Sequence, residues 1–451
     1  MSGGKLPEGW VKSELDNILL TIIGGGTPSK AIPEYYQGDI PWMSVKDMNK
    51  HTLTDTIDHI TNDAVENSST NIIPAGTPII ATRMSLGKIV TASFDSAINQ
   101  DLKALFLSSG VDRNFFIHWY RSQAQLIESL GTGTTVKGIR LEVLKALSIN
   151  LPPFFEQKNI AEKLDTLLAQ VESIKARLEQ IPQILKRFRQ AVLIAAFTKK
   201  LTVSSEFTEK KISDICSFQN GFAFKSSWFS KTGSYQVIKL ANIRDGYLFL
   251  ENAPAYVNEE QGVEFSKFSP NIGDVLISMT GTRFKKDYGF GCIMTQKHKA
   301  LINQRVGRLI PIKASILPEY LFLFVRSELF REQFFKGETG GVNQGNVGSQ
   351  HIQSILINVP PLTEQHEIVR RVEQLFAYAD TIEKQVNSAL TRVNSLTQSI
   401  LAKAFRGELT AQWRAENPDL ISGENSTAAL LERIKAERAA SSGKKSSRKK
   451  A

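Results

Sequence analysis

The residue types and spacings that usually carry out catalysis are almost absent from this chain. The segment Gly24–Lys30 is rich in glycine but lacks the Gly-Lys-Ser/Thr ending of a phosphate-binding loop. The six histidines show no metal-ligand spacing, and no Gly-x-Gly-x-x-Gly motif opens a helix after a strand. We therefore expect no metal site, and we expect His118, His298, His351 and His366 to be surface or structural residues.

One further motif deserves a comparison with catalytic sequences. Asn150-Leu151-Pro152-Pro153-Phe154 resembles the Asn-Pro-Pro-aromatic motif with which amino-methyltransferases hold an exocyclic amine, but a leucine intervenes. The second occurrence, at 358–362, has no aromatic residue. We interpret both as a strand end followed by a helix start. Two cysteines, Cys216 and Cys292, cannot build a disulfide framework or a cysteine-rich metal site. We predict that the chain has no catalytic residues.

What remains is a group of loops whose side chains suit DNA. Sequence-specific reading of DNA uses Arg, Lys, Asn or Gln at base edges, with basic and hydroxyl groups on phosphates. Such loops occur at 82–88 and 131–140, and again at 280–286 and 341–346, at corresponding positions but with different residues. For any single residue, a solvated surface charge is the alternative. The candidate DNA-binding residues are Arg83, Lys88, Thr134, Lys137, Arg140, Arg283, Lys285, Lys286, Asn343, Gln344 and Asn346.

Strands and helices must position these loops. Short apolar runs that lie between Gly, Pro and Asp residues predict the strands. The predicted strands lie around Trp42, at Ile79–Ile80 and Ala104–Leu107, and at Val237–Leu240, Val275–Ser278 and Gly307–Ile310. Helices are expected over 114–130 and 318–335. Each of these two regions is therefore predicted to be a mixed α+β domain of about 150 residues, a usual domain size.

The chain contains an internal repeat. The stretch from Pro152 to Thr202 returns as Pro360 to Thr410 at a constant difference of 208, without a gap and with 14 of 51 positions identical. Upstream the match is looser, and Ile98-Asn99-Gln100 returns as 302–304 at a difference of 204. Each half therefore consists of a variable globular part, which tolerated insertions, followed by a rigid part.

The rigid parts carry apolar residues at alternating steps of four and three, which is typical of a coiled coil. We expect two long helices that form an intramolecular antiparallel coiled coil, with a kink at Pro182. The alternative is two amphipathic helices, each packed on its own domain. The predicted seam residues are Ile160, Leu164, Leu167, Val171, Ile174 and Leu178 in the first helix, and Ile368, Val372, Leu375, Ile382, Val386 and Val393 in the second.

Composition and charge are consistent with a globular protein that contacts nucleic acid. Hydrophobic residues make up 41% and charged residues 22% of 451 residues. The net charge is +10, and five of these charges lie in residues 441–451, which we expect to be a disordered basic tail. The longest apolar run, Ala191–Phe197, is too short for a membrane span. The first ten residues do not resemble a signal peptide, so we expect a soluble cytoplasmic protein.

The repeated Pro-Pro-x-x-Glu-Gln segments, each beginning a long heptad helix after a variable domain, resemble the specificity subunits of type I restriction-modification enzymes. The resemblance covers essentially the whole chain. PPFFEQKNIAEKLDTLLAQ and PPLTEQHEIVRRVEQLFAYAD carry it. The beginning MSGGKLPEGW and the ending RGELTAQWRAENPDLISGENS are similar to the enteric type IA branch in particular.

This resemblance implies a non-catalytic protein that confers sequence specificity on a complex. Each variable part would be a target recognition domain that reads one half of an asymmetric, bipartite DNA site. The two helices would set the spacer between the half-sites and dock two modification subunits. The assembly would also recruit two restriction subunits. S-adenosylmethionine, ATP and Mg²⁺ would be used by those partner subunits, and no cofactor would be bound by this chain.

The expected fold class is α+β, with two target recognition domains separated by two long helices and related by a pseudo-twofold repeat. Two other classes remain open: a self-contained nuclease or methyltransferase with a degenerate motif, and a coiled-coil scaffold that binds only proteins. The expected boundaries are 1–153 for the first recognition domain, 154–207 for the central helical region, 208–361 for the second recognition domain, 362–410 for the distal helical region and 411–451 for the C-terminal segment.

Overall fold

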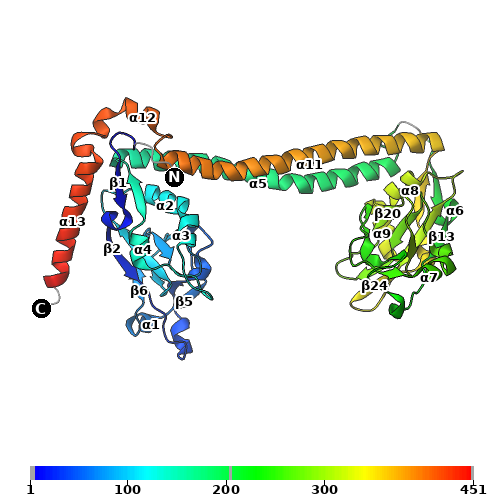
Figure 1. Ribbon diagram of the computed structural model, residues 1–451, viewed down its shortest axis with the longest axis horizontal. Coiled ribbons are helices and arrows are strands. Elements are labelled where there is room, and N and C mark those ends of the chain that lie inside the picture. The colour runs from blue at the N-terminus through cyan, green and yellow to red at the C-terminus, as the bar shows by residue number, and fades with distance from the viewer. Residues whose placement is uncertain (1–5, 203–205, 448–451) are drawn as a thin grey trace. The chain divides into compact units, whose positions relative to one another are not determined.

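The computed structural model describes residues 6–202 and 206–447. The chain divides into two compact units, and each is described below by itself. The first unit contains residues 1–177 and 389–451, and the second contains residues 178–388. The two longest helices are divided between the units, so each helix has one part in the first unit and one part in the second. These helices are α5 (Phe154–Phe197) and α11 (Leu362–Phe405) (Figure 1).

The first unit is built on two small sheets with short helices beside them. A five-stranded sheet has the order β2-β10-β7-β8-β4, and a four-stranded sheet has the order β5-β3-β9-β6. The strands are β1 (Val11–Glu14), β2 (Leu19–Gly24), β3 (Ile40–Met43), β4 (Thr52–Leu53), β5 (Asp58–Ile60), β6 (Asn71–Ile73), β7 (Ile79–Ala81), β8 (Ile89–Ala92), β9 (Ser96–Ile98), β10 (Leu102–Leu107) and β11 (Ser148–Leu151). The helices are α1 (Asn62–Glu66), α2 (Arg113–Ser122), α3 (Ala124–Ser129) and α4 (Leu141–Lys145).

The second unit repeats this plan with more, shorter sheets. Its largest sheet has the order β13-β22-β18-β20, and two three-stranded sheets have the orders β17-β14-β21 and β19-β24-β23. The strands are β12 (Thr208–Lys211), β13 (Cys216–Asn220), β14 (Tyr235–Ile238), β15 (Ile243–Arg244), β16 (Tyr247–Leu248), β17 (Tyr256–Val257), β18 (Val275–Ser278), β19 (Thr280–Thr282), β20 (Gly291–Ile293), β21 (Ala300–Ile302), β22 (Val306–Pro311), β23 (Glu338–Gly340), β24 (Gln344–Val347) and β25 (Leu356–Val359). The helices are α6 (Ile212–Ile215), α7 (Glu259–Glu264), α8 (Pro318–Val325), α9 (Glu328–Lys336) and α10 (Ser349–Ser354).

Five of the six predicted strand regions are strands over their full length, and the mixed α/β character of both domains is confirmed. The sixth, Val237–Leu240, is a strand only to Ile238, because a single-turn 3-10 helix begins at Leu240. Each predicted helical stretch is instead a pair of short helices. In the second unit α8 ends before Ser327, whose hydroxyl accepts a hydrogen bond from the Phe330 amide and so begins α9. Serine favours such capping positions over helix interiors, and the apolar pattern does not report this competition.

The strand register confirms the internal repeat. In the first unit β3 pairs in parallel with β9, with Met43 opposite Ile98. In the second unit β14 pairs in parallel with β21, with Ile238 opposite Ile302. Met43 and Ile238 are 195 residues apart, and Ile98 and Ile302 are 204 apart, the difference at which the Ile-Asn-Gln triplet returns. The loosely matching upstream parts therefore share one scaffold.

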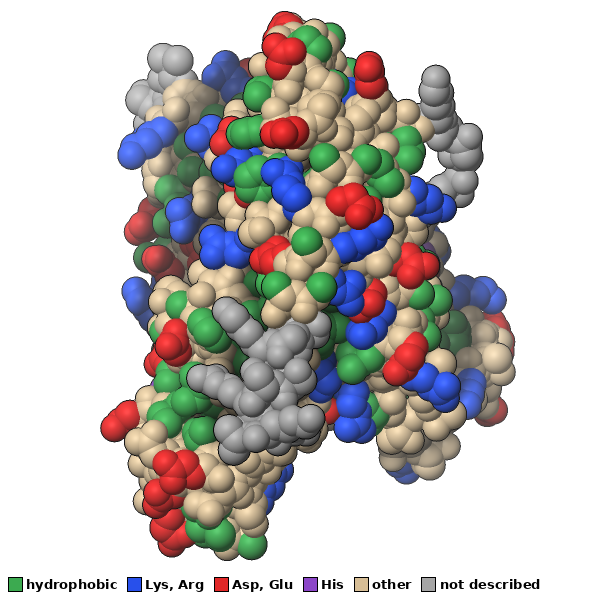
Figure 2. All heavy atoms as spheres, turned by 90° about the vertical axis from the view of Figure 1, so that its left-hand side faces the viewer, with side chains coloured by type: hydrophobic (Ala, Val, Ile, Leu, Met, Phe, Trp, Pro, Cys, Tyr) green, Lys and Arg blue, Asp and Glu red, His purple; other side chains and the backbone are tan. Residues whose placement is uncertain are grey.

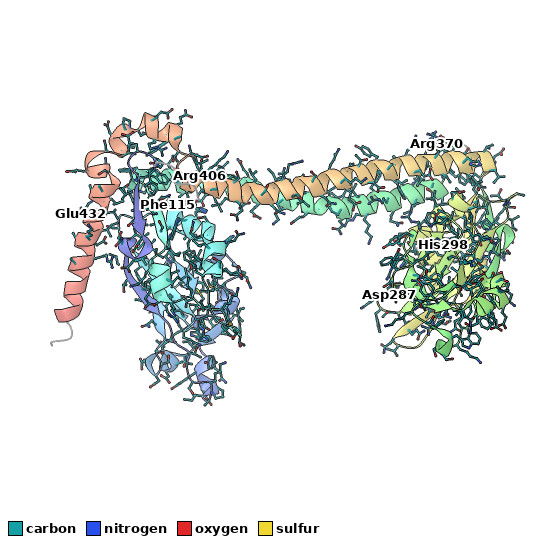
Figure 3. All side chains as sticks on the ribbon, in the orientation of Figure 1. Phe115, Asp287, His298, Arg370, Arg406 and Glu432 are labelled. Carbon is teal, nitrogen blue, oxygen red and sulfur yellow. The ribbon has the colours of Figure 1, made fainter. Side chains whose placement is uncertain are left out.

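The long helices contribute to the hydrophobic core of each unit. In the first unit, the start of α5 and the end of α11 share one core cluster, which includes Ile160, Leu164 and Ile400. Figure 3 labels Phe115 of α2, whose ring lies 5.6 Å from that of Phe405 in α11. In the second unit, the end of α5 and the start of α11 share another cluster, which includes Val192, Ile368 and Val372.

Burial along the predicted seam is uneven. Most seam residues are buried or half-buried, but Ile174 is 48% exposed, so the expectation of a buried seam is wrong at this residue. Leu396 of α11, which continues the apolar stripe of that helix beyond Val393, is 44% exposed. A straight α-helix drifts by about 20° per heptad relative to a 3.5-residue repeat, so such a stripe leaves the contact face along a long helix. In the second unit, Arg189 of α5 pairs with Asp380 and Glu383 of α11.

The repeated glutamine of the Pro-Pro-x-x-Glu-Gln motif ties each long helix to its domain. Gln157 Oε1 accepts a hydrogen bond from the Asp112 amide at 2.9 Å, and its Nε2 donates to the carbonyl oxygens of Gly110 and Pro152. Gln365 makes the same three bonds, with the Leu317 amide at 2.8 Å and with the carbonyl oxygens of Ser315 and Pro360. Both side chains are fully buried. The motif is therefore kept in both copies because it joins the helix start to the loop before α2 or α8.

The glutamate before it differs between the copies. Glu156 is fully buried and accepts hydrogen bonds from Trp10 Nε1 (2.9 Å), Thr410 Oγ1 (2.7 Å) and the Arg414 guanidinium. These partners lie near the beginning and the end of the chain. Glu364 is half-buried, and its Oε1 has no hydrogen-bond partner among the described residues. Thr202, which corresponds to Thr410, also has a buried hydroxyl without a partner among those residues.

The C-terminal segment forms α12 (Ala411–Glu416) and α13 (Thr427–Ser447) and belongs to the first unit. Arg438 of α13 donates to the carbonyl oxygen of Asp16, and Leu430 is buried. Because the backbone of α13 continues to Ser447, the expected disorder of the tail is wrong for residues 441–447. Local composition does not explain this helix, because residues 441–447 are mainly Ser and Gly, which are weaker helix formers than Ala or Lys. Arg448, Lys449 and Lys450 lie outside the described residues.

Candidate nucleic-acid interface

The two candidate loops of the first unit lie side by side. Arg83 and Gly138 form an antiparallel bridge, and the Met84 amide donates to the Lys137 carbonyl oxygen at 3.0 Å. Gly87, with a φ of +78°, lies so close to the backbone of Ala124 that a Cβ atom would overlap it. Backbone hydrogen bonds therefore join the hairpin between β7 and β8 to the segment around Lys137 and Gly138. The candidate residues of the two loops thus lie on one surface.

The five candidate side chains of the first unit differ in how free they are. Arg83 is exposed and its Nη1 lies 3.2 Å from Asp101 Oδ1, so an acid already orients this guanidinium. Lys88 donates to Asn49 Oδ1 at 2.7 Å. Thr134, Lys137 and Arg140 are exposed, and no side-chain hydrogen bond or ion pair is recorded for them among the described residues. These three side chains are therefore free to contact phosphates or base edges.

A hollow of about 680 Å³ adjoins this surface, and sequence reasoning missed it. One wall is aromatic, because the rings of Tyr36 and Trp42 lie edge to face at 5.8 Å. Its polar side chains include donors suited to base edges. The hollow is lined by Thr27, Lys30, Pro33, Tyr36, Trp42, Ser44, Val45, Lys46, Asp58, Met84, Asn99, Gln100 and Asp101.

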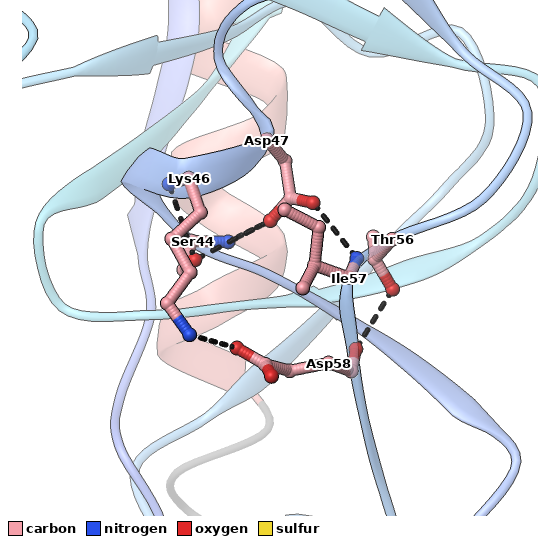
Figure 4. Close-up of polar contacts among 6 residues, drawn as sticks. All are labelled: Ser44, Lys46, Asp47, Thr56, Ile57 and Asp58. Carbon is pink, nitrogen blue, oxygen red and sulfur yellow. Dashed lines mark hydrogen bonds and ion pairs between the residues drawn. The ribbon is translucent and has the colours of Figure 1, made fainter. Parts of the chain in front are cut away.

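The side of this hollow that carries Lys46 is held by a buried aspartate (Figure 4). Asp47 Oδ2 accepts from the Ser44 amide at 2.8 Å, and its Oδ1 accepts from the Ile57 amide at 2.9 Å. Asp47 thus joins the turn at 44–47 to the strand segment that follows. Lys46 Nζ then reaches Asp58 Oδ2 at 2.9 Å, and this hydrogen bond raises the pKa of Lys46. Because the lysine is exposed, water screens the pair and its ammonium remains available to a phosphate.

Two features noted in the sequence lie at this hollow, although neither one indicated a binding surface there. The glycine-rich segment Gly24–Lys30 fails as a phosphate-binding loop, but Gly25 lets it pass against Ile98, where a Cβ atom would overlap the carbonyl oxygen. Gln100 belongs to the repeated Ile-Asn-Gln triplet, and its Oε1 accepts from the Thr27 hydroxyl. In the second unit Gly221 packs against Asn303 in the same way. The glycines are therefore explained by close backbone packing that positions the hollow.

The two candidate loops of the second unit also meet. Strand β19 pairs antiparallel with β24, with Thr280 opposite Asn346 and Thr282 opposite Gln344. The Thr280 hydroxyl also bonds Asn346 Oδ1 at 2.7 Å, so this asparagine is partly engaged. The Thr282 amide donates to Asp287 Oδ1 at 2.7 Å, which closes the turn between them; Figure 3 labels Asp287.

The candidate side chains of this unit again include one arginine held by an acid. Arg283 Nε lies 3.2 Å from Glu338 Oε2. Glu338 Oε1 in turn accepts from the Tyr288 hydroxyl, and burial together with this bond raises the pKa of Tyr288. The ammonium of Lys286 lies 5.0 Å from the centre of the Phe335 ring. Lys285, Asn343 and Gln344 are exposed, and no side-chain hydrogen bond is recorded for them among the described residues.

Arg331 of α9 supports this loop, and sequence reasoning missed it. Its Nη2 donates to the Lys286 carbonyl oxygen at 3.0 Å, and its Nη1 donates to the Tyr288 carbonyl oxygen at 3.1 Å. The guanidinium also lies 4.9 Å from the Phe290 ring centre. Arg331 therefore satisfies carbonyl groups that the turn leaves unpaired, including that of Lys286, whose φ is +46°. A helix-surface arginine carries no sequence signal for such a role.

Over residues 6–202 and 206–447, no group of three or more His, Cys, Asp or Glu side chains could hold a metal ion. Cys216 and Cys292 are buried free thiols. None of the described helices is both long and apolar enough to cross a membrane. On the face in Figure 2, which carries α13, acidic and basic side chains are interspersed, so that face has no field of a single sign.

Comparison with known proteins identifies the family. Residues 7–183 and 204–392 each match the family described as type I restriction modification DNA specificity domain, so the two matches together cover most of the chain. The chain is 40% identical over 481 aligned residues to the EcoKI specificity subunit of Escherichia coli K12, and 39% identical over 477 to the StySPI specificity subunit of Salmonella potsdam. In both cases the match covers all of each chain.

Solved structures agree at the level of the fold. The HsdS subunit from Thermoanaerobacter tengcongensis matches with a TM-score of 0.61 at 19% identity, over 90% of this chain and 99% of that one. A chain from a structure of type I restriction-modification complex assembly matches with a TM-score of 0.66 at 18% identity, over 90% of this chain and all of that one. With both halves of the repeat matched and relatives aligned from end to end, the chain belongs to the specificity subunits of type I restriction-modification enzymes, in the enteric type IA branch.

Proposed function

We propose that each recognition domain reads one half of an asymmetric, bipartite DNA site. The observation that carries this proposal is that both units bring the same two loops together, while the exposed residues on those loops differ. The pairs are Arg83 with Gly138 and Thr282 with Gln344. A shared scaffold with different side chains would let two related domains read unrelated half-sites, and each wrong base pair costs about 1–3 kcal/mol.

In the first domain we place the reading surface over the hollow beside the 82–88 loop. Gln100 would contact an adenine edge or a similar donor-acceptor pair, while Lys46 and Lys137 would bind a phosphate or a guanine edge. Arg83 would act from a position set by Asp101. These assignments rest on exposure and on the chemistry of the side chains.

The long helices would form an antiparallel coiled coil that sets the spacer and docks the partner subunits. The core clusters that α5 and α11 share within each unit support this arrangement. We propose that two modification subunits dock on the helices and that two restriction subunits join through the assembly. S-adenosylmethionine, ATP and Mg²⁺ would be used by those partners and not by this chain.

Genome-wide mapping of adenine methylation tests the division of labour. Replacing residues 1–153 with the recognition domain of a relative should change one half-site and leave the other half-site and the spacer unchanged. If both halves change, the two domains do not read independently. Lengthening α5 and α11 together by one heptad should alter the spacer and keep both half-sites. An unaltered spacer would contradict the role of the helices.

Point variants test the reading surfaces within the same assay. Gln100→Ala should relax one position of the first half-site by about 1–3 kcal/mol, while Asn343→Ala should relax the second half-site only. An exposed residue away from the loops, as in Lys12→Gln, is the matched control. The alternative classes predict other results: the purified chain alone would methylate or cut DNA if it were an enzyme, and the assembled complex would leave no sequence-specific footprint if it were only a scaffold.

A further inference from the structure

A second hollow of the first unit lies at the opposite end of the β7–β8 hairpin from the 82–88 loop. Residues 75–76, before β7, and Ser93, after β8, line it, together with side chains from β4, α2 and α5. Its volume is about 490 Å³. The polar side chains that matter here are His51, Thr52, Thr91, Arg113, Arg121 and Asp165.

Arg121 is the unusual member of this group. Its side chain is half-buried, yet no hydrogen bond or ion pair is recorded for its guanidinium among the described residues. Burial lowers the pKa of Arg121. Arginine does not lose its proton in proteins, so the charge cannot be removed by titration. A partly buried cation without a direct hydrogen bond or ion pair is unfavourable. The nearby Asp165 carboxylate offsets this cost in part, and an anion in the hollow would offset it further.

The neighbouring groups supply further donors. Arg113 and Arg121 both belong to α2, and both side chains line the hollow. Arg113 Nη1 makes a 3.4 Å hydrogen bond to the Gly76 carbonyl oxygen, and its guanidinium has no further hydrogen bond or ion pair among the described residues. The hydroxyl groups of Thr52 and Thr91 have no recorded hydrogen bond among the described residues. Four donors therefore line the hollow from a helix and two strands.

One carboxylate opposes the binding of an anion. Asp165 of α5 accepts a hydrogen bond from His118 Nε2 at 2.7 Å, and no ion pair joins it to Arg121. His118 is 5% exposed, its Nδ1 has no hydrogen-bond partner among the described residues, and burial lowers the pKa of its ring. Because a carboxylate can only accept, the His118 ring donates from Nε2 in this hydrogen bond. His51, Glu172 and Asp112 are further titratable groups near the hollow. Among the residues that line it, two guanidinium groups face one carboxylate.

We propose that this hollow binds a phosphoryl group, with Arg113 and Arg121 on its charged oxygens and Thr52 and Thr91 donating to it. The size of the hollow and the separate directions of the donors suit a phosphodiester segment or a free phosphate better than a single planar carboxylate. In DNA, the phosphate would be a backbone contact apart from the reading loops, which would add affinity without sequence preference. The DNA source rests on the proposed function, whereas binding of free phosphate does not.

The test compares two ligands on the full-length chain. Titration calorimetry with inorganic phosphate measures the site by itself, and binding of a random-sequence DNA duplex over a range of salt concentrations measures a backbone contact. Arg121→Gln should weaken phosphate binding about tenfold. It should also weaken duplex binding equally for all sequences and reduce the salt slope by about 1. Lys12→Gln removes one exposed charge elsewhere in the same unit and is the control.

Each outcome decides the proposal. Loss in both titrations supports a site for DNA backbone phosphate, and loss with inorganic phosphate alone supports a site for free phosphate. If Arg121→Gln behaves like Lys12→Gln with both ligands, the proposal is overturned. If the wild-type chain binds no duplex, DNA reading by this chain fails, and the phosphate titration still decides the site.

A gain-of-binding variant guards against simple unfolding. Asp165→Asn keeps an oxygen for His118 Nε2 and removes the opposing charge, so phosphate binding should strengthen roughly threefold. Arg121→Lys keeps the charge and should retain more phosphate binding than Arg121→Gln. Weaker phosphate binding in Asp165→Asn with an unchanged melting temperature would contradict the proposal.

Discussion

The starts of the two long helices are built from the same motif but have different surroundings. At the first start, Glu156 is fully buried and receives bonds from Trp10, Thr410 and Arg414. At the second, Glu364 has an oxygen without a partner, and Thr202 has a hydroxyl without one, among the described residues. The glutamine beside each glutamate makes three equivalent bonds in both copies. The glutamine of the motif is thus a structural residue in both copies. The glutamate is one only in the first copy, where residues from near both ends of the chain bond to it.

The largest expected difference between the copies concerns the two glutamates. Glu156→Gln removes the charge that balances Arg414, whose side chain is 13% exposed, and should destabilise the first unit by about 3–5 kcal/mol. Glu364→Gln is the matched control and should change stability by less than about 0.5 kcal/mol. Chemical denaturation, with hydrogen exchange at each helix start, measures both. Equal losses would mean that the copies do not differ in this respect.

The glutamines should behave alike. Gln157→Ala and Gln365→Ala each leave a buried amide and buried carbonyl groups unpaired, so each should cost about 2–4 kcal/mol. Faster hydrogen exchange is expected at Asp112 in the first variant and at Leu317 in the second. A large effect in only one copy would show that the shared hydrogen bonds are not equally important.

The tryptophan at the first helix start gives a smaller, reciprocal test. Trp10→Phe removes one donor to Glu156 and should cost about 1–3 kcal/mol. Phe207 occupies the corresponding position before β12, so Phe207→Trp should place a donor near Glu364 and increase the stability of the second unit by up to about 1 kcal/mol. Melting temperatures of the two single variants and of the double variant measure these effects. A loss in Phe207→Trp would show that the second site cannot accept the donor.

The smallest effect is expected at Thr202. Thr202→Val replaces a buried hydroxyl without a partner and should be neutral or slightly stabilising, within about 0.5 kcal/mol. Thr410→Val removes the 2.7 Å bond to Glu156 and should cost about 1–3 kcal/mol. The same denaturation series compares them. A clear loss in Thr202→Val would indicate a partner that this arrangement does not account for.

The candidate site was predicted in part. The four loops were identified from their basic and amide residues, and the structure brings them together in pairs. The hollow lined by Tyr36, Trp42 and Gln100 was missed, because its walls come from segments up to 74 residues apart, from Thr27 to Asp101, and no local pattern joins them. The support of the second loop by Arg331 was missed for the same reason: an arginine that binds carbonyl groups looks in sequence like a solvated one.

The sequence alone determined the duplication, the two long helices and the mixed domains. Residue periodicity and repeated motifs can be read directly from the order of residues, without knowledge of which distant residues meet. Only the tertiary structure decided which polar residues are free. Arg83 is paired with Asp101 and Arg283 with Glu338, whereas Arg121 has no hydrogen-bond or ion-pair partner in the part of the chain that the structure describes. It also decided that Ile174, placed on the apolar stripe, is largely exposed. Pairing and burial depend on residues far apart in the chain, and spacing along the sequence carries no information about them.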